Sequence, residues 1–392
     1  MLVLLSLNFG AVFVSRNAAG LTGPYLKHAL DLDNTELGAL SAGYGLAWAV
    51  VGYFGTTLIE RRMNTWTALA ALAMLDAASL FGTAVATSFW AVMVFRLVAG
   101  GAGGPAMPLS AARIARGSSP RNRGQRMGVI QAFGGGLIGA ILAPLCLIGL
   151  ADAWGWRVPF AAAGVICAAA GGLLWFGARA LALDVPDTAP SATGTSGTAG
   201  VQSRRNVVLC CIVSALMVGW LVVTTTFLPT FLVGTLGWSF SRTALAMSGF
   251  GFTSMMSAVV APLISDRVGR RPALVGCTLV GGITAVGVCL LRSDSPQLLG
   301  MVAGVGIAGG AFPIFMAAIP AESAVAGRVA AGIALVQGVG EVLGGVAAPL
   351  IAGYAGDQLG ARAMVWVATV CVCAAALVSC LVLETNPPRL RL

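Results

Sequence analysis

Apolar residues gather in long runs along this chain, and short polar segments separate the runs. Twelve runs approach or exceed the roughly 20 residues that a helix needs to cross a bilayer. The first has neither the basic start nor the cleavage site of a signal peptide, so it too is predicted to be a membrane span. The predicted transmembrane helices are 3–27, 36–59, 66–86, 89–112, 125–150, 158–181, 207–232, 242–264, 273–291, 296–319, 329–355 and 363–383.

One polar segment stands out by its length and composition. Residues 184–203 read DVPDTAPSATGTSGTAGVQS, and their Gly, Ser, Thr, Ala and Pro are typical of a flexible linker. We therefore predict an N-terminal six-helix bundle at 1–183, a cytoplasmic linker at 184–206 and a C-terminal six-helix bundle at 207–392.

The two predicted bundles share sequence. Residues 143–157, APLCLIGLADAWGWR, match residues 348–362, APLIAGYAGDQLGAR, at six of fifteen positions. An even number of spans in each half predicts parallel repeats, related by an axis along the membrane normal. Such a pair encloses a central site that can open alternately to either side.

The amino-acid composition indicates that most of the protein surface faces lipid. Only 9% of the 392 residues are charged and 58% are hydrophobic, whereas a soluble domain is about 25% charged. The protein cannot cover itself with charge, and lipid must therefore be its main solvent. This predicts an all-α polytopic membrane protein.

The basic residues assign the orientation. With both termini taken as cytoplasmic, sixteen of the 23 Lys and Arg residues lie in cytoplasmic segments, five lie on the opposite side, and Arg16 and Arg96 lie within the membrane. This asymmetry follows the positive-inside rule. The net charge of +9 is thus a topology signal, and no nucleic-acid partner is expected. We predict a multi-pass protein of the inner (plasma) membrane.

Cofactor and catalytic chemistry have no support in the sequence. The nine cysteines all fall in apolar runs, and the one histidine, His28, cannot form a metal site by itself. There is neither a phosphate-binding Gly-Lys-Ser loop nor a plausible nucleophile–base pair. We expect no cofactor, no metal and no enzymatic activity.

Three motifs carry a family resemblance. PLISDRVGRR (262–271), its degraded counterpart IERRMNTW (59–66) and FRLVAGGAGG (95–104) resemble the second-loop and fourth-helix motifs of the major facilitator superfamily. The resemblance implies twelve helices in two bundles and secondary transport by alternating access. It also implies that the charged residues of the second loop form a cytoplasmic latch between the halves. These residues are Asp266, Arg267, Arg270 and Arg271.

Other stretches resemble a particular branch, the anion:cation symporter family. They are Arg16 with the downstream TGPYL, RLVAGGAGGPAMP (96–108), GWRVPF (155–160) and GVGEVLGGVAAPLIAG (338–353). The resemblance implies that Arg16 binds a substrate carboxylate and that Tyr44 and Gln131 contact substrate. That family usually has acids where this chain has Ser15 and Gly103, and those acids are implicated in proton coupling. Proton coupling must therefore use another group or be absent.

The two arginines within the membrane are candidate substrate ligands. A mid-helix arginine costs about 2.5–3.5 kcal/mol even on lenient insertion scales, and such residues normally face an interior cavity. The guanidinium of Arg16 matches a carboxylate bidentately, although a structural pair with a buried acid is the alternative. Arg96 either holds helices together through backbone carbonyls or adds a second positive charge to the cavity.

Two acids, Asp76 and Glu341, also lie within predicted spans. A carboxyl group buried there can load and release a proton. Glu341 is the first candidate for proton coupling, and it follows the candidate substrate ligand Gln337 by one turn on the same face. Asp76 is the second, because third helices are peripheral in this fold. Gly340 and Gly344 form a small-xxx-small pair suited to close packing.

These residues predict a secondary transporter that imports a small organic carboxylate, with protons as the coupling ion. The alternative within the same fold is an exporter of drugs or metabolites that exchanges them for protons. A transport-dead sensor is a third reading, but no appended soluble domain supports it. The expected partners are an anionic small molecule, protons and the lipid bilayer, and the expected oligomeric state is a monomer.

Overall fold

The computed structural model describes residues 1–116, 123–180, 201–290, 297–323 and 329–385. Within these ranges the chain forms helices and no strands. Twelve helices are long and apolar enough to cross a membrane, the first being Leu2–Leu21 and the last Ala361–Ser379. The predicted all-α polytopic fold with twelve spans is therefore confirmed.

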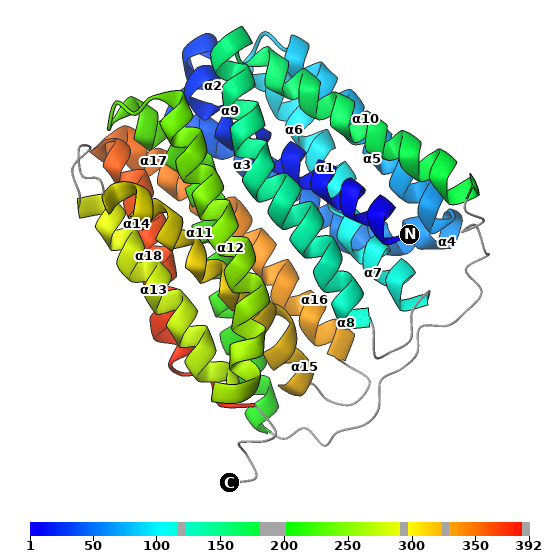
Figure 1. Ribbon diagram of the computed structural model, residues 1–392, viewed down its shortest axis with the longest axis vertical. Coiled ribbons are helices and arrows are strands. Elements are labelled where there is room, and N and C mark those ends of the chain that lie inside the picture. The colour runs from blue at the N-terminus through cyan, green and yellow to red at the C-terminus, as the bar shows by residue number, and fades with distance from the viewer. Residues whose placement is uncertain (117–122, 181–200, 291–296, 324–328, 386–392) are drawn as a thin grey trace. The chain divides into compact units, whose positions relative to one another are not determined.

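The N-terminal half contains six spans, several of which are built from consecutive helical segments (Figure 1). Its helices are α1 (Leu2–Leu21), α2 (Gly23–Leu30), α3 (Asn34–Val50), the π-helical η1 (Val51–Gly55), α4 (Thr56–Arg62), α5 (Thr65–Val85), α6 (Phe89–Gly103), α7 (Ala106–Arg116), α8 (Arg123–Ile130), the π-helical η3 (Gln131–Leu142), α9 (Ala143–Trp154) and α10 (Arg157–Ala180).

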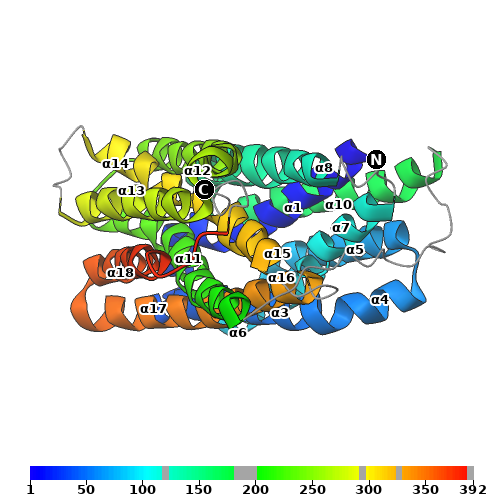
Figure 2. The ribbon, with the colours of Figure 1, turned by 90° about the horizontal axis from the view of Figure 1, so that it is seen from below.

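The C-terminal half also contains six spans, and its α-helices are labelled in Figures 1 and 2. They are α11 (Val201–Gly234), α12 (Phe240–Val268), α13 (Arg270–Leu290), α14 (Gln297–Val305), the 3-10 helix η4 (Gly306–Ala311), the π-helical η5 (Ile314–Ala318), α15 (Ile319–Ser323), α16 (Val329–Val339), the π-helical η6 (Gly340–Ala347), α17 (Ala348–Leu359) and α18 (Ala361–Ser379).

The chain divides into two compact units. One comprises Met1–Ser191 with Ser239–Ser248, and the other comprises Ala192–Trp238 with Gly249–Leu392. Most of the predicted linker at 184–206 lies outside the described residues, and α11 already begins at Val201. The linker boundaries and the division at 1–183 and 207–392 remain predictions.

The first span is shorter than predicted, because it ends at Leu21 rather than at residue 27. The hydroxyl of Thr22 donates back to the Ala18 carbonyl at 2.7 Å. Pro24 then stands in the first turn of α2, where its fixed φ and missing amide hydrogen favour a new helix start. The TGPYL stretch is thus a helix junction.

The internal sequence repeat builds the same local structure twice. In each half a π-helical segment, η3 or η6, is followed by an α-helix with proline in its first turn, at Pro144 and at Pro349. Proline cannot donate to the preceding turn, and this loosens the regular ladder of hydrogen bonds. Both helices end at a glycine with positive φ, +82° at Gly155 and +90° at Gly360. The shared residues therefore specify a shared backbone path.

Close helix packing at glycines positions the site described below. A methyl group added at Gly100 on α6 would collide with the Tyr44 carbonyl oxygen on α3. In the C-terminal unit, methyl groups at Gly340 and Gly344 would collide with Ser214 and with the Ala215 carbonyl on α11. The prediction that Gly340 and Gly344 allow close packing is confirmed.

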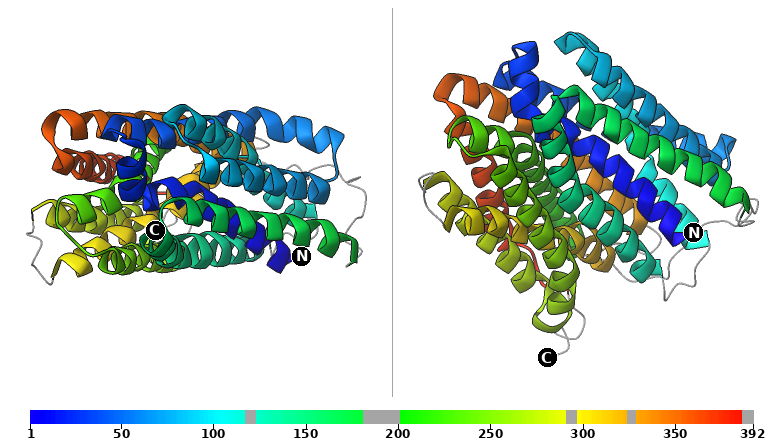
Figure 3. Two further views of the ribbon diagram at one scale, coloured as in Figure 1. Left: turned by 90° about the horizontal axis from the view of Figure 1, so that it is seen from above. Right: turned by 45° about the horizontal axis from the view of Figure 1, so that its top comes forward.

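Helix α1 lies inside the N-terminal unit. It packs against η3 and α10, and α5 packs along α10. The right panel of Figure 3 shows dark-blue α1 between the teal α8–α9 segment and the green α10. This central place brings residues of α1 against side chains from α5, α6 and α10.

Candidate functional site

A cluster of polar and charged side chains surrounds the C-terminal half of α1. We call it the α1 cluster; its members are Ser15, Arg16, Tyr44, Trp48, Asp76, Arg96 and Cys167, and all lie in the N-terminal unit. Consecutive residues of a helix point about 100° apart. The side chains of Ser15 and Arg16 therefore face different neighbours, Asp76 on α5 and Trp48 on α3 respectively.

Arg96 fastens α6 to α1. Its side chain is only 1% exposed. Nη1 donates to the Ser15 carbonyl at 2.9 Å, and Nη2 donates to the Arg16 carbonyl at 3.0 Å. The guanidinium carbon also lies 4.3 Å from the centre of the Tyr44 ring, a favourable cation–π distance. Of the two roles considered for Arg96, the structure supports the one that holds helices through backbone carbonyls.

Arg16 carries the other positive charge of the cluster. Its side chain is half-buried, and the guanidinium carbon lies 4.9 Å from the centre of the Trp48 ring. Trp48 is itself buried and lies one helical turn after Tyr44, with ring centroids 5.8 Å apart. Asn17 donates to the Gly139 carbonyl of η3 at 3.2 Å. The turn of α1 that carries Arg16 is therefore anchored on two sides, by Arg96 and by Asn17.

Asp76 is buried, although other residues of the third span are exposed, such as Met74 and Leu75. It is 1% exposed. Oδ1 accepts from the Ser15 hydroxyl at 2.8 Å, and Oδ2 faces the Cys167 thiol at 3.6 Å. The third span packs against both α1 and α10, and this packing places the carboxyl group between them.

Three other predicted site residues are not members of the α1 cluster as defined here. Gln131 begins η3 with an exposed side chain. In the C-terminal unit, Gln337 on α16 and Glu341 on η6 are both half-buried and one turn apart. A methyl group at Gly345 would lie 3.2 Å from Glu341 Oε2, so this carboxyl group lies along its own helix. The substrate-binding and coupling roles of these residues remain predictions.

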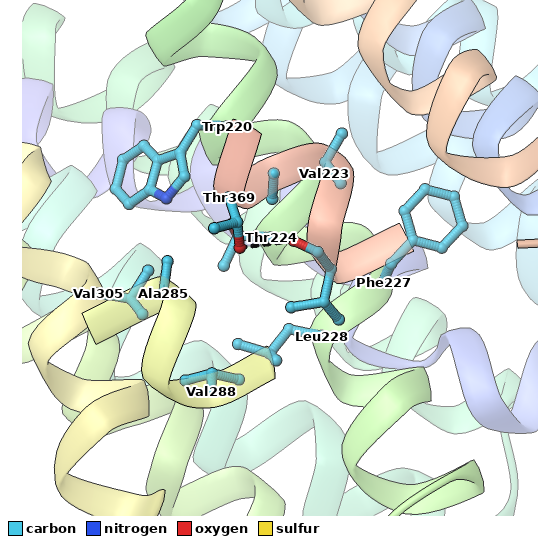
Figure 4. Close-up of a pocket in the computed structure, with 11 residues that line it drawn as sticks. Trp220, Val223, Thr224, Phe227, Leu228, Ala285, Val288, Val305 and Thr369 are labelled. Atoms are coloured by element: carbon cyan, nitrogen blue, oxygen red, sulfur yellow. Dashed lines mark hydrogen bonds between the residues drawn. The ribbon is translucent and has the colours of Figure 1, made fainter. Parts of the chain in front are cut away.

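A small pocket in the C-terminal unit is almost wholly apolar (Figure 4). It encloses about 20 Å³, enough for about one water molecule. The hydroxyl of Thr369 donates to the Val365 carbonyl at 2.9 Å (Figure 4). The lining residues are Trp220, Val223, Thr224, Phe227, Leu228, Ala285, Val288, Val305, Val365, Ala368 and Thr369. Trp220 and Thr224 thus line a pocket that is too small for an organic substrate.

The predicted latch residues belong to a charged cluster at one end of the C-terminal unit. Arg270 pairs with Asp266 at 2.5 Å and with Glu322 at 2.7 Å. The Glu384 carboxylate accepts from the backbone amides of Arg270 and Arg271 at 2.7 and 3.2 Å, and it therefore caps the start of α13.

The same cluster extends to the start of α11. Asn206 donates to the Leu383 carbonyl at 3.1 Å and accepts from the Leu383 amide at 3.0 Å. Arg267 and Arg271 have exposed side chains. These partners of Arg270, Arg271 and Asn206 all lie in the C-terminal unit, and the latch between the halves remains a prediction.

Sequence reasoning missed several members of these clusters. Glu322 lies just beyond the tenth predicted span and Glu384 just beyond the twelfth, so acids at span ends were an available signal. Trp48 follows the predicted substrate contact Tyr44 by one helical turn, so helical spacing was an available signal for it. No sequence signal pointed to Cys167. Among the described residues, no group of three or more His, Cys, Asp or Glu could hold a metal ion.

Twelve helices that are long and apolar enough to cross a membrane indicate a multi-pass membrane protein. A family model described as Major Facilitator Superfamily matches residues 5–263 and 208–392. The chain therefore belongs to the major facilitator superfamily, whose members are membrane transporters.

Individual relatives agree with this class. The hexuronate transporter of Bacillus subtilis (strain 168) is 26% identical over 165 residues, which cover 42% of this chain and 37% of that protein. The match thus spans little more than a third of the relative's length. A bacterial homologue of the human lysosomal transporter Spinster, in its inward-facing unoccupied form, has a TM-score of 0.79 at 14% identity and covers 97% of this chain and 96% of its own.

The nucleoside transporter NupG also resembles the chain. Its structure has a TM-score of 0.72 at 16% identity, with 96% of this chain and 97% of NupG covered. At such low identity these structures support the fold alone.

Proposed function

We propose that this transporter moves a small organic carboxylate across the inner (plasma) membrane by alternating access, with protons as the coupling ion. The observation that carries the proposal is Arg16. Its guanidinium lies over Trp48, in the C-terminal half of the span Leu2–Leu21, on a turn whose backbone Arg96 holds in place.

The charge of the α1 cluster favours an anion as its ligand. Arg16 and Arg96 supply two positive charges, and Asp76 supplies at most one negative charge. Because little water screens charges inside the protein, both arginines attract a carboxylate that binds near them. Arginine also offers two parallel donors to a carboxylate. The anchored backbone reduces the conformational entropy lost when the anion binds.

The chemistry beside Arg16 suggests which carboxylates to test first. The indole ring of Trp48 offers an apolar, aromatic surface next to the guanidinium. Binding pockets commonly combine such a surface with a few placed polar groups. A sugar acid has an apolar ring face and a carboxylate, and the partial match to a hexuronate transporter favours the same class. We therefore take glucuronate as the first probe.

The test compares glucuronate with glucose on purified protein. Glucuronate should raise the melting temperature of the wild type, and glucose should not, because it lacks the carboxylate. In Arg16→Gln the glucuronate affinity should fall about 10- to 100-fold, the loss expected for charge-assisted hydrogen bonds. Equal stabilisation of the wild type and Arg16→Gln by every carboxylate tested would refute the role of Arg16.

The proposed orientation has its own test. Both termini are proposed to be cytoplasmic, because the basic residues are concentrated in the segments assigned to that side. A green fluorescent protein fused to the C-terminus should be fluorescent in a bacterial host, since it folds in the cytoplasm. A dark fusion with normal protein levels would reverse the proposed orientation.

A further inference from the structure

We propose that Asp76 is the group that carries the coupling proton, and that it acts on anion binding through Ser15 and the turn of α1 between Asp76 and Arg96. The proposal rests on the proposed transport of an anion and specifies its coupling site. It differs from the sequence analysis, in which Glu341 was the first candidate and Asp76 the second.

The first step of the argument is the environment of the carboxyl group. Asp76 is 1% exposed, and the described groups that hydrogen-bond to its side chain are neutral. They include the Ser15 hydroxyl at 2.8 Å and the Cys167 thiol at 3.6 Å, and the Ser79 hydroxyl, which donates to the Asp76 carbonyl at 2.7 Å, also lies nearby. Among the residues that the structure describes, no basic side chain forms an ion pair with it. A carboxylate buried without a paired cation is costly. The Asp76 carboxyl group is therefore suited to gain and lose a proton rather than to stay permanently ionised.

The second step is that both partners can serve either protonation state. A hydroxyl donates and accepts, so Ser15 can donate to the carboxylate or accept from the protonated acid. The Cys167 thiol lies 3.6 Å from Asp76 Oδ2 and also 3.6 Å from the Ala11 carbonyl oxygen. It therefore has a second acceptor available when Asp76 is protonated. Neither state leaves a member of this trio without a partner.

The third step connects Asp76 to the anion. The Ser15 side chain faces Asp76, while the carbonyls of Ser15 and Arg16 accept from Arg96. One turn of α1 thus lies between the carboxyl group and the Arg96 guanidinium, and it carries Arg16. Protonation of Asp76 removes a negative charge from a cluster with two arginines, which strengthens the attraction for an anion. Because linkage is reciprocal, a bound anion favours protonation equally.

The elements that pack against α5 carry other ionisable groups. The guanidinium of Arg113, on α7, lies 5.3 Å from the ring centre of Trp66. Trp66 precedes Asp76 by ten residues, nearly three turns of α5. Glu60, Arg61 and Arg62 on α4 precede the start of α5. The groups at the level of Asp76 are Arg16 on α1, Tyr44 on α3, Arg96 on α6 and Cys167 on α10.

The direct test follows the proton by infrared spectroscopy and needs no substrate. Purified protein in lipid is taken from acidic to alkaline buffer, and the band of a protonated carboxyl group is recorded. We expect a band that titrates in the wild type, is lost in Asp76→Asn, and remains in the matched control Glu341→Gln. A wild-type titration that Asp76→Asn leaves intact, or that Glu341→Gln abolishes, overturns the proposal.

Two further variants keep the test decisive if Asp76→Asn does not fold. Ser15→Ala and Cys167→Ala each remove one partner of the carboxyl group but keep the acid. The titrating band should persist in both variants with a changed midpoint. Unchanged midpoints in both would show that the titrating group lies elsewhere, and the proposal would be wrong.

A transport assay then separates coupling from anion binding, with radiolabelled glucuronate in proteoliposomes. Asp76→Asn mimics the protonated acid. With equal glucuronate concentrations on both sides of the membrane, this variant should still exchange glucuronate. In the wild type a pH step should drive glucuronate accumulation, by about tenfold per pH unit for one proton, and the variant should lose this accumulation. Full accumulation by Asp76→Asn overturns the coupling role alone. If glucuronate is not bound by the wild type, the proposed substrate class fails, and the infrared result still decides the role of Asp76.

Discussion

The two halves of the transporter share backbone features but not chemistry. Each has a π-helical segment, a proline in the first turn of the next helix, and a helix end at a glycine with positive φ. The first helix of the N-terminal half carries Ser15 and Arg16 inside a charged cluster. The first helix of the C-terminal half, α11, instead lines an apolar pocket of about 20 Å³. A duplicated sequence can thus conserve the path of the chain while, among the described residues, the buried charged side chains Asp76, Arg96 and Arg113 all lie in one copy.

The fourth span of each half shows the same contrast. In the N-terminal half α6 combines glycine packing against α3 with the buried Arg96. In the C-terminal half the 3-10 helix η4 also packs through glycine, since a methyl group at Gly310 would lie 2.9 Å from the Ser257 carbonyl oxygen. It has no charged residue. Close packing and charge are therefore separate requirements, and the following predictions test them separately.

The largest effect is expected at Arg16. Arg16→Lys keeps the charge but loses the planar pair of donors, so uptake should be severely impaired, by about 10- to 100-fold in kcat/KM, while folding and membrane insertion are retained. Uptake of labelled carboxylate in proteoliposomes measures this loss. Near-normal uptake by the lysine variant would mean that Arg16 acts only as a positive charge.

A strong effect on stability is expected at Gly344. Its replacement by alanine places a methyl group against the Ala215 carbonyl on α11, and overpacking of this kind costs about 1–3 kcal/mol. Gly338→Ala is the matched control, because Gly338 lies one to two turns earlier and has nothing within 4 Å of an added methyl group. Thermal unfolding in detergent should show a lower melting temperature for Gly344→Ala. Equal melting temperatures would contradict the close packing of η6 on α11.

A smaller effect, on rate, is expected at the charged cluster of the C-terminal unit. Asp266→Asn removes one partner of Arg270, and it should slow transport several-fold while changing substrate affinity less, since a latch alters the balance of states without touching ligand. Rate and affinity are separated by transport and binding assays on one preparation. Lost affinity with an unchanged rate in Asp266→Asn would contradict the predicted latch.

The smallest effect is expected at Thr224. Thr224→Val preserves the shape of the residue in the apolar pocket of the C-terminal unit, so carboxylate affinity should change by less than about threefold, equivalent to roughly 0.5 kcal/mol. The melting-temperature shift on adding glucuronate measures this. A loss as large as that of Arg16→Lys would show that both halves contribute substrate ligands, and the contrast between them would not hold.

Much of the fold could be predicted because membrane helices leave local signals. Runs of apolar residues located the twelve spans, and the Gly340–Gly344 spacing located a close contact. Helix ends were less accurate, since the junction at Thr22 depends on a side-chain hydrogen bond and on Pro24. Local patterns thus give the elements and most of their approximate limits.

The site was harder to predict, because it depends on contacts between distant residues. Asp76 and Cys167 are 91 residues apart, and Arg96 reaches a carbonyl 81 residues earlier in the chain. The sequence left two roles open for Arg96, and only its partners distinguish them. It also ranked Asp76 below Glu341 from the general position of third helices. The burial of Asp76 follows from how α1, α5 and α10 pack in this protein.

The contacts of Asn206 with Leu383 and of Glu384 with the start of α13 have a consequence for biosynthesis. Asn206 and Leu383 are 177 residues apart, so α11 and α13 leave the ribosome long before their partners do. Until then the first amides of α13 lack the Glu384 cap. Insertion of these helices into the membrane therefore precedes completion of their tertiary contacts. The C-terminal unit can complete these contacts only after Leu383 and Glu384, which follow α18, have been synthesised.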